Sequence, residues 1–356
     1  MTILQPAESF LLRVLAGSAG LFRGDDYPQR LAQAAAGAQL PVTTGRRISV
    51  VGSRGGAGRT TAAALLARIY AALRADAVAA VDNAPESGTL GLRLGVPGAP
   101  SLDAVAARRG PAVPDSLREL AALLTVAGPA NLLVTGRRRP RSWTGAGPGA
   151  GPGAGPARVR PVPAAWVPPG PAAGAPDWQP DFSHPGGAGK TGTGSEEAAA
   201  SLLRVISRYC PVTLFDCGPG LGDPDARRVL DQAHLALFVT PASAYGLADA
   251  AEYASGWELD PLLAGVPLLV LVVQPDRDSD FNAAREAGRL RRSGIDAASL
   301  GYDRHLATGL VVDPSKCSRR TRLEAASLAS RVLSAAVSAP PAAPAATDRP
   351  LRRVSA

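Results

Sequence analysis

The chain has 356 residues, of which 46% are apolar, and it carries a formal net charge of +8 with a pI near 10.0. This apolar content suffices for a sizeable core. The positive charge favours acidic partners such as nucleic acid or an anionic membrane face, and a basic surface that serves only solubility is the alternative. Of the 38 basic residues 36 are arginine, because only Lys190 and Lys316 are lysine.

Cysteine spacing, the N-terminal residues and the length of apolar runs disfavour zinc-binding, exported and membrane-spanning proteins. Cys210, Cys217 and Cys317 form no CxxC pair, and no cluster with the histidines has zinc spacing, so we expect reduced thiols in a cytoplasmic protein. The stretch from 10 to 22 lacks a basic leader, which disfavours a signal peptide. The longest apolar run, 266–273, is far shorter than the ~20 residues that span a bilayer.

Short apolar runs alternate with helical stretches along the chain, which is the pattern of a parallel sheet covered by helices on both faces. The expected strands are Ile48 to Val51, Val78 to Val81, Asn131 to Thr135, Val212 to Phe215, Leu235 to Val239 and Leu268 to Val273. The clearest helices are Thr60 to Leu73, Ala198 to Tyr209 and Leu247 to Trp257. The predicted fold class is α/β, with a doubly wound, mostly parallel sheet.

Glycine and proline are concentrated between Gly145 and Gly194 and after Ala339. Such segments bury too little apolar surface to offset their ordering entropy. We therefore predict a single domain at 46–336, interrupted by a disordered Gly/Pro-rich insertion at 141–195, with an N-terminal arm at 1–45 that adds a helix or two and a disordered basic tail at 337–356.

Aromatic and apolar residues outside this domain leave two interpretations open. The insertion contains Trp143, Trp166 and Trp178, which are either scattered exposed aromatics or contact points for a partner. In the arm, an apolar stripe either docks onto the domain or binds a partner. The stripe consists of Phe10, Leu11, Val14 and Leu15.

One segment has the three parts of a phosphate-binding loop in order, namely a buried strand, a glycine-rich turn and a helix N-terminus. Gly55, Gly56 and Gly58 permit the tight turn that follows the strand ending at Val51. Thr60 opens the helix at the position whose hydroxyl binds Mg²⁺, and Thr61 can hydrogen-bond a phosphate. A glycine turn without a ligand is the alternative.

A second glycine cluster, HPGGAGKTG from His184, contains Lys190 followed by Thr191 and matches the phosphate-loop pattern superficially. No buried strand precedes it, because PDWQPDF is polar and broken by proline, and no helix start follows it. We therefore do not expect it to bind phosphate.

The segment SRGGAGRTT resembles the deviant Walker A motif K-G-G-x-G-K-T-T of the ParA/MinD family of P-loop ATPases. Downstream, AVAAVDNAP resembles the family's D-x-x-P motif at Asp82 and Pro85, and PVTLFDCGPGLGD resembles its Walker B strand and switch II at Asp216 and Gly220. The resemblance covers residues 46–140 and 196–336. Two late segments, SRYCPVTLFDCGPGLGD and GYDRHLATGLVVDPSKCSRRTR, look like actinobacterial MinD-like proteins, some of which are associated with type VII secretion.

The resemblance implies a P-loop NTPase that binds ATP or ADP with Mg²⁺ between two face-to-face subunits, so that ATP drives homodimerisation. By position, Arg54 replaces the signature lysine, Arg59 replaces the loop lysine, and Asp82 orients the attacking water; these three form the implied catalytic set. The implied nucleotide-binding residues are Gly55, Gly56, Ala57, Gly58, Arg59, Thr60, Thr61 and Gln274. The implied magnesium residues are Thr60, Asp82 and Asp216.

Three departures from the family pattern point to a degenerate Walker A motif and a pseudo-ATPase. Arg54 and Arg59 keep the charge, but a planar guanidinium does not match a compact ammonium wrapped by a loop. A misplacement of about 1 Å at the transferring phosphoryl group costs on the order of a hundredfold in rate. Gln274 stands where the resemblance leads us to expect an asparagine that holds the base. We expect reduced nucleotide affinity and slow or absent turnover.

The leading hypothesis is thus a nucleotide-binding scaffold or regulator of the ParA/MinD type, acting in partitioning, positioning or type VII secretion with a protein partner. An active, ATP-switched dimeric ATPase is the first alternative. The second is a non-specific DNA-binding protein, in which arginines of two segments share a face. They are Arg289, Arg291 and Arg292 with Arg319, Arg320 and Arg322. Membrane association is disfavoured, because the last helical stretch has few cations.

Overall fold

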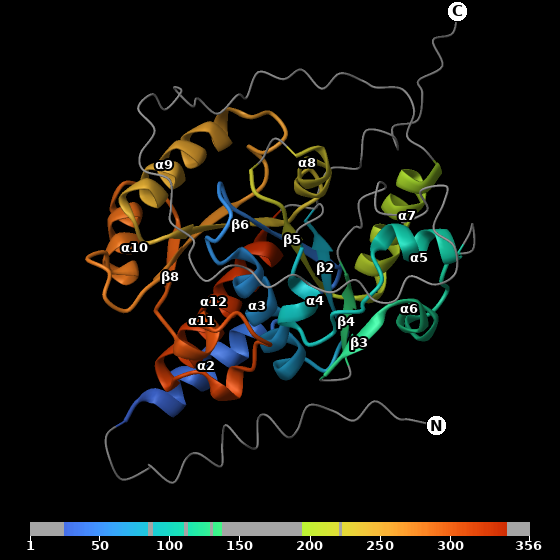
Figure 1. The fold of residues 1–356 in the computed structure, drawn as a ribbon, viewed down its shortest axis with the longest axis horizontal. Helices are drawn as coiled ribbons and strands as arrows, with labels where there is room; N and C mark the ends of the chain where they lie inside the picture. Colours follow the sequence, from blue (N-terminus) through green and yellow to red (C-terminus); the bar gives the residue numbers. More distant parts are fainter. Residues whose placement is uncertain are drawn as a thin grey trace, which may run out of the picture.

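The computed structural model describes residues 25–84, 88–109, 113–128, 131–136, 194–220 and 223–339. Its centre is an eight-stranded sheet in the order β3-β4-β2-β5-β1-β6-β7-β8 (Figure 1). Seven strands are parallel, and β3 runs antiparallel to β4 at one edge. The strands are β1 Arg46–Val51, β2 Val78–Asn83, β3 Thr125–Ala127, β4 Leu132–Thr135, β5 Val212–Cys217, β6 Leu235–Pro241, β7 Leu268–Val273 and β8 Ala297–Leu300.

Helices cover both faces of the sheet (Figure 1). One layer contains α2 Tyr27–Ala38, α3 Arg59–Leu73, α4 Leu90–Arg93, α11 Arg304–Ala307 and α12 Arg319–Ser338, with the 3₁₀ helix η2 Pro314–Lys316 beside it. The other contains α5 Leu102–Arg109, α6 Leu117–Leu123, α7 Gly194–Tyr209, α8 Pro224–Leu230, α9 Ala244–Leu259 and α10 Ala283–Arg292. The predicted doubly wound α/β fold is confirmed.

The central strands are mostly apolar because successive side chains enter different cores. In β1, Ile48 and Val50 pack into the core beneath α3 and α12, whereas Val51 packs into the core on the other face. Strands with both faces covered lose the alternation of polar and apolar residues. This is why β1, β2, β5, β6 and β7 could be recognised from short apolar runs.

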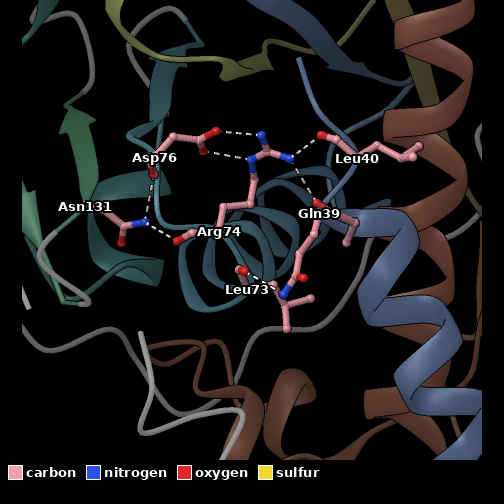
Figure 2. Close-up of polar contacts among 7 residues, drawn as sticks. Gln39, Leu40, Leu73, Arg74, Asp76 and Asn131 are labelled. Carbon is pink, nitrogen blue, oxygen red and sulfur yellow. Dashed lines mark hydrogen bonds and ion pairs between the residues drawn. The ribbon is translucent and has the colours of Figure 1, made fainter. Parts of the chain in front are cut away.

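A cluster of polar contacts joins the amino end of the sheet to α2 (Figure 2). The Arg74 guanidinium, which follows α3, makes a bidentate ion pair with Asp76 at 2.8 and 2.6 Å, and donates to the carbonyls of Ala38 and Leu40. The Asn131 amide donates to the carbonyls of Arg74 and Asp76. Helix α2 packs along α12, so the first and last helices of the described chain lie side by side (Figure 1).

Several predictions concern residues outside the described ranges. These are the apolar stripe of the arm, the tryptophans of the insertion, the second glycine cluster with Lys190, Pro85 of the D-x-x-P segment, and the tail beyond residue 339. Within the described ranges, no helix combines the length and apolarity needed to cross a bilayer.

Candidate functional site

The loop between β1 and α3 turns through two glycines with left-handed backbone. Gly56 has φ +79° and Gly58 has φ +94°, a region that strains any residue with a Cβ. A Cβ built on Gly55 or Gly56 would meet no atom within 4 Å, so the space beside this part of the loop is open. Gly58 precedes the 15-residue helix α3, whose positive dipole end and free N–H groups therefore face that space.

A cavity of about 420 Å³ lies against this loop. Its size falls within the ~300–1,000 Å³ typical of small-molecule sites. The lining includes Gly56, Ala57, Gly58, Thr60, Thr61 and Gln274 from the predicted nucleotide-binding set, together with Arg93, Val273, Tyr302 and Leu306. Residues on five separate stretches of the chain thus meet at the carboxyl end of the parallel strands, where ligands of open α/β sheets bind.

Asp216, next to the last residue of β5, is a buried carboxylate without a hydrogen-bond partner. Both of its oxygens are inaccessible and accept no hydrogen bond from the described residues. Burial is the main cause that raises the pKa of Asp216 to about 7, and the charge of Asp82 acts in the same direction. The Thr60 hydroxyl and the Arg59 guanidinium lie near enough to oppose that rise, although neither makes a hydrogen bond of normal geometry to it.

Asp82 occupies the register position next to Asp216, on the neighbouring strand β2. Its carboxylate accepts hydrogen bonds from the backbone N–H groups of Ala84, at 3.3 Å, and Leu90, at 3.2 Å. Gly88 passes so close that an added Cβ would lie 2.1 Å from Oδ1 of Asp82. The side chain is therefore held by the loop that follows its own strand, with Asp216 beside it.

Arg59, the first residue of α3, turns its side chain back across the loop. Its Nη1 donates to the carbonyl of Cys217 at 3.0 Å, and its methylene groups lie against Gly52. Burial lowers the pKa of Arg59, and the charge of Asp216 acts in the opposite direction. The guanidinium thus lies between the phosphate-type loop and the end of β5.

Arg54 is bound to α9 of its own chain. Its Nε donates to Oδ2 of Asp249 at 3.0 Å, and its guanidinium lies 5.2 Å from the ring centre of Tyr245. Ser53 donates to the same carboxylate oxygen at 2.7 Å. The hydrogen bond to Asp249 raises the pKa of Arg54, whose side chain is 57% exposed. This residue lies beside the cavity rather than in its lining.

The amide of Gln274 is engaged with the backbone that follows β7. Its nitrogen donates to the carbonyls of Asp276 and Phe281, and its oxygen accepts from the N–H of Ala283 at 2.8 Å. Gln274 therefore lines the cavity while its polar atoms close a loop.

Sequence reasoning missed two residues of this region. Arg93 lines the cavity and donates to Thr61, and Asp249 holds Ser53 and Arg54. Arg93 lies in an ordinary GLR triplet, and Asp249 lies 195 positions after Arg54. No local pattern marks either residue.

Comparison with solved structures identifies the fold. A ParA family ATPase from Chlorobium tepidum TLS aligns with a TM-score of 0.52 at 15% identity, over 79% of this chain and 98% of that chain. The Cyanothece McdA(D38A)-ATP complex aligns with a TM-score of 0.50 at 14% identity, over 82% of this chain and 97% of that chain. No protein-family model and no curated protein matches the sequence. The chain therefore has the P-loop NTPase fold of ParA and MinD-like ATPases.

Proposed function

We propose that this chain is a ParA/MinD-type protein that binds ADP or ATP with Mg²⁺ at the loop 53–61 and acts as a scaffold or regulator, with weak or no hydrolysis. The observation that carries the proposal is the buried Asp216 carboxylate, which has no hydrogen-bond partner and lies beside Thr60 at the base of an open glycine loop. A buried charge of this kind is costly unless a cation or a donor balances it.

The residues present fit a magnesium ion. Mg²⁺ in nucleotide sites is held by one or two carboxylates and substrate phosphates rather than by a protein cage. The described residues contain no cluster of three or more His, Cys, Asp or Glu able to hold a metal, which agrees with such a shared site. Asp216, Asp82 and the Thr60 hydroxyl would hold the ion, which supplies charge neutralisation for the phosphates. The N–H groups at the start of α3 and the turn 55–58 would bind phosphate oxygens.

The surroundings of Arg59 support slow or absent turnover. Its guanidinium donates to the Cys217 carbonyl, and no atom of the described residues lies within 4 Å of a Cβ built on Gly55 or Gly56. A planar fork fixed in this way cannot follow a phosphoryl group as a compact ammonium on a flexible stem can. Nucleotide state, rather than hydrolysis, would then set the activity of the protein.

Nucleotide binding is tested by thermal unfolding with Mg²⁺·ADP and Mg²⁺·ATP. A ligand at a hundred times its Kd stabilises the folded state by about 2.7 kcal/mol, so we expect a clear rise in melting temperature. The matched variant Thr60→Val keeps the volume but removes the hydroxyl, and should lose most of the Mg²⁺-dependent part of the shift. Unchanged melting of the unmodified chain with every Mg²⁺-nucleotide would refute the proposal.

Hydrolysis is tested separately, by phosphate release from ATP for the unmodified chain and for Arg59→Lys. We expect little release from the unmodified chain. If the guanidinium is the cause, the lysine variant should release phosphate faster at equal nucleotide occupancy. Brisk turnover by the unmodified chain would instead establish the alternative, an active ATPase.

The position of Arg54 favours the ATP-switched dimer as the second candidate. Its exposed guanidinium lies beside the cavity, where a second subunit of a face-to-face dimer would approach. Light scattering with and without Mg²⁺·ATP tests this, with Arg54→Ala as the variant expected to stay monomeric. A monomer at all nucleotide concentrations would leave a scaffold that works as a single chain.

DNA binding receives partial support from a basic hollow of about 660 Å³ at α2, α12 and the edge strand β8. Its lining includes Arg30, Arg291, Arg319, Arg320 and Arg331. Carboxylates partly offset this charge, because Arg319 pairs with Asp25, Arg320 with Glu324 and Arg331 with Asp296. Affinity for duplex DNA that falls steeply with salt would support this role, and the absence of binding at low salt would end it. A role in type VII secretion or partitioning would be supported if the purified chain captures a protein component of such machinery.

A further inference from the structure

Arg93, the last residue of α4, is a buried cation in the wall of the cavity. Only 5% of it is exposed. It donates to Oγ1 of Thr61 at 2.6 Å and to the carbonyls of Leu306 and Leu310, at 3.0 and 2.8 Å. All of these acceptors are neutral, and among the described residues Arg93 forms no ion pair, so its charge is not balanced by a carboxylate. Burial lowers its pKa, in keeping with a missing counter-charge.

The contact with Thr61 fixes the direction of a second hydrogen bond. A guanidinium has only donors, so the Thr61 oxygen must accept the bond between them. The hydroxyl proton of Thr61 is then left to donate to another acceptor. Within the described residues it donates to none, and Thr61 lines the cavity at the start of α3.

Arg93 also joins the two walls of the cavity. It belongs to the segment that follows Asp82, whereas Leu306 and Leu310 belong to the segment around α11, and the N–H of Val312 donates back to the Arg93 carbonyl at 2.8 Å. These bonds restrict the guanidinium to one position. An anion in the cavity would meet a fixed charge and a fixed donor together.

We infer that Arg93 is a positioning residue for phosphate: it holds the Thr61 hydroxyl as a donor toward the phosphates of a bound nucleotide and supplies a positive charge next to it. This inference rests on the proposed nucleotide-binding function and adds to it a residue outside the Walker-type motifs. Arg93 thereby provides cationic charge in a pocket whose loop arginines are directed elsewhere, Arg59 to Cys217 and Arg54 to Asp249.

The experiment measures the affinity of the full chain for Mg²⁺·ADP and for adenosine, by competition with a fluorescent ADP analogue. Arg93→Gln should weaken binding of Mg²⁺·ADP about tenfold or more, because it removes the positive charge beside the phosphates and the charge-assisted hydrogen bond that orients the Thr61 hydroxyl. It should leave the affinity for adenosine unchanged, because adenosine has no phosphate. Arg93→Lys, which retains charge, should recover part of the loss. Equal losses for both ligands, or no loss for either, would show a structural role only and overturn the inference.

Thr61→Val supplies the second arm, which remains informative if Arg93→Gln fails to fold. This variant keeps the shape of the side chain and should also weaken Mg²⁺·ADP selectively. In the double variant the loss should be smaller than the sum of the two single losses, because each single change already removes the oriented hydroxyl and only Arg93→Gln also removes the charge. Additive losses would contradict the positioning role. If the unmodified chain binds neither ligand, the proposed function itself fails and the inference falls with it.

Discussion

Helix α3 has an arginine at each end, and the two differ in what surrounds their charge. Arg74, after the last turn, pairs with Asp76 through two hydrogen bonds and donates to the carbonyls of Ala38 and Leu40 (Figure 2). Arg59, in the first turn, makes a single hydrogen bond to the carbonyl of Cys217, with the unpartnered Asp216 nearby. Arg74 thus has all of its partners within the chain, whereas Arg59 lies among groups that remain incompletely paired.

The same contrast separates the two ends of the sheet. At the amino end, His234 accepts a hydrogen bond from the N–H of Arg47 at its Nδ1. At the carboxyl end, Asp216 accepts none, and Arg93 has only neutral partners. Buried polar groups are normally satisfied, so those left incomplete indicate where a ligand belongs. The incomplete pairing of these two charged groups supports the binding function proposed for the carboxyl end; at the amino end the buried Nε of Arg46 and Oγ1 of Thr213 also lack partners among the described residues.

The largest expected effect comes from removing the paired arginine. Arg74→Met should lower the free energy of unfolding by about 4 kcal/mol, because it leaves Asp76 without its cation and removes the donor to the buried Ala38 carbonyl and the partly buried Leu40 carbonyl. Urea unfolding measures this loss, with Arg59→Met as the matched change at the other end of α3. A smaller loss for Arg74→Met than for Arg59→Met would reverse the comparison.

The second effect is a pH dependence at the amino end. Burial, followed by the charges of Arg47 and Arg46, lowers the pKa of His234 from 6.5 to about 4. Below pH 6.5 the unfolded chain takes up a proton that the folded chain refuses, so stability is lost as pH falls from 6.5 toward 4. The shift corresponds to about 3 kcal/mol. His234→Asn keeps an acceptor for the Arg47 N–H, and its denaturation midpoint should vary less over this window; an unchanged pH profile would contradict the assignment.

At Asp216 a substitution is expected to increase the stability of the ligand-free protein rather than to decrease it. Asp216→Asn removes a buried charge that the chain leaves without a hydrogen-bond partner, so the ligand-free protein should become more stable by about 2 kcal/mol above neutral pH. The same variant should lose the added stability conferred by Mg²⁺·ADP. Chemical denaturation with and without the nucleotide measures both effects. Destabilisation of the ligand-free variant would mean that the carboxylate stabilises the fold by itself.

The smallest effect is expected at Arg54. Its side chain is 57% exposed, whereas its partner Asp249 is only 7% exposed and keeps the hydrogen bond from Ser53, so Arg54→Ala should lower the free energy of unfolding by about 1 kcal/mol. High salt should reduce even this difference. A loss comparable to that of Arg74→Met would show that Arg54 is a structural residue rather than one available to a partner.

Much of the fold was predictable because its signals are local. The six predicted strands are confirmed, each within two residues at either end, since strands buried on both faces are continuous apolar runs. The glycine turn and the start of α3 follow directly from the order of residues 52–61. The edge strands β3 and β8 were not predicted, because they are only three and four residues long and AASL has no β-branched or aromatic residue.

The sequence by itself determined the glycine-rich loop, the presence of Arg54 and Arg59 in it, and the alternation that produces a doubly wound sheet. Each of these is written in contiguous residues. Only the tertiary structure decided that Arg54 pairs with Asp249, that Arg93 donates to Thr61, and that the carboxylate of Asp216 is left without a hydrogen bond. The physical reason is that pairing and burial of polar atoms depend on which distant segments pack together, and no spacing along the chain specifies that.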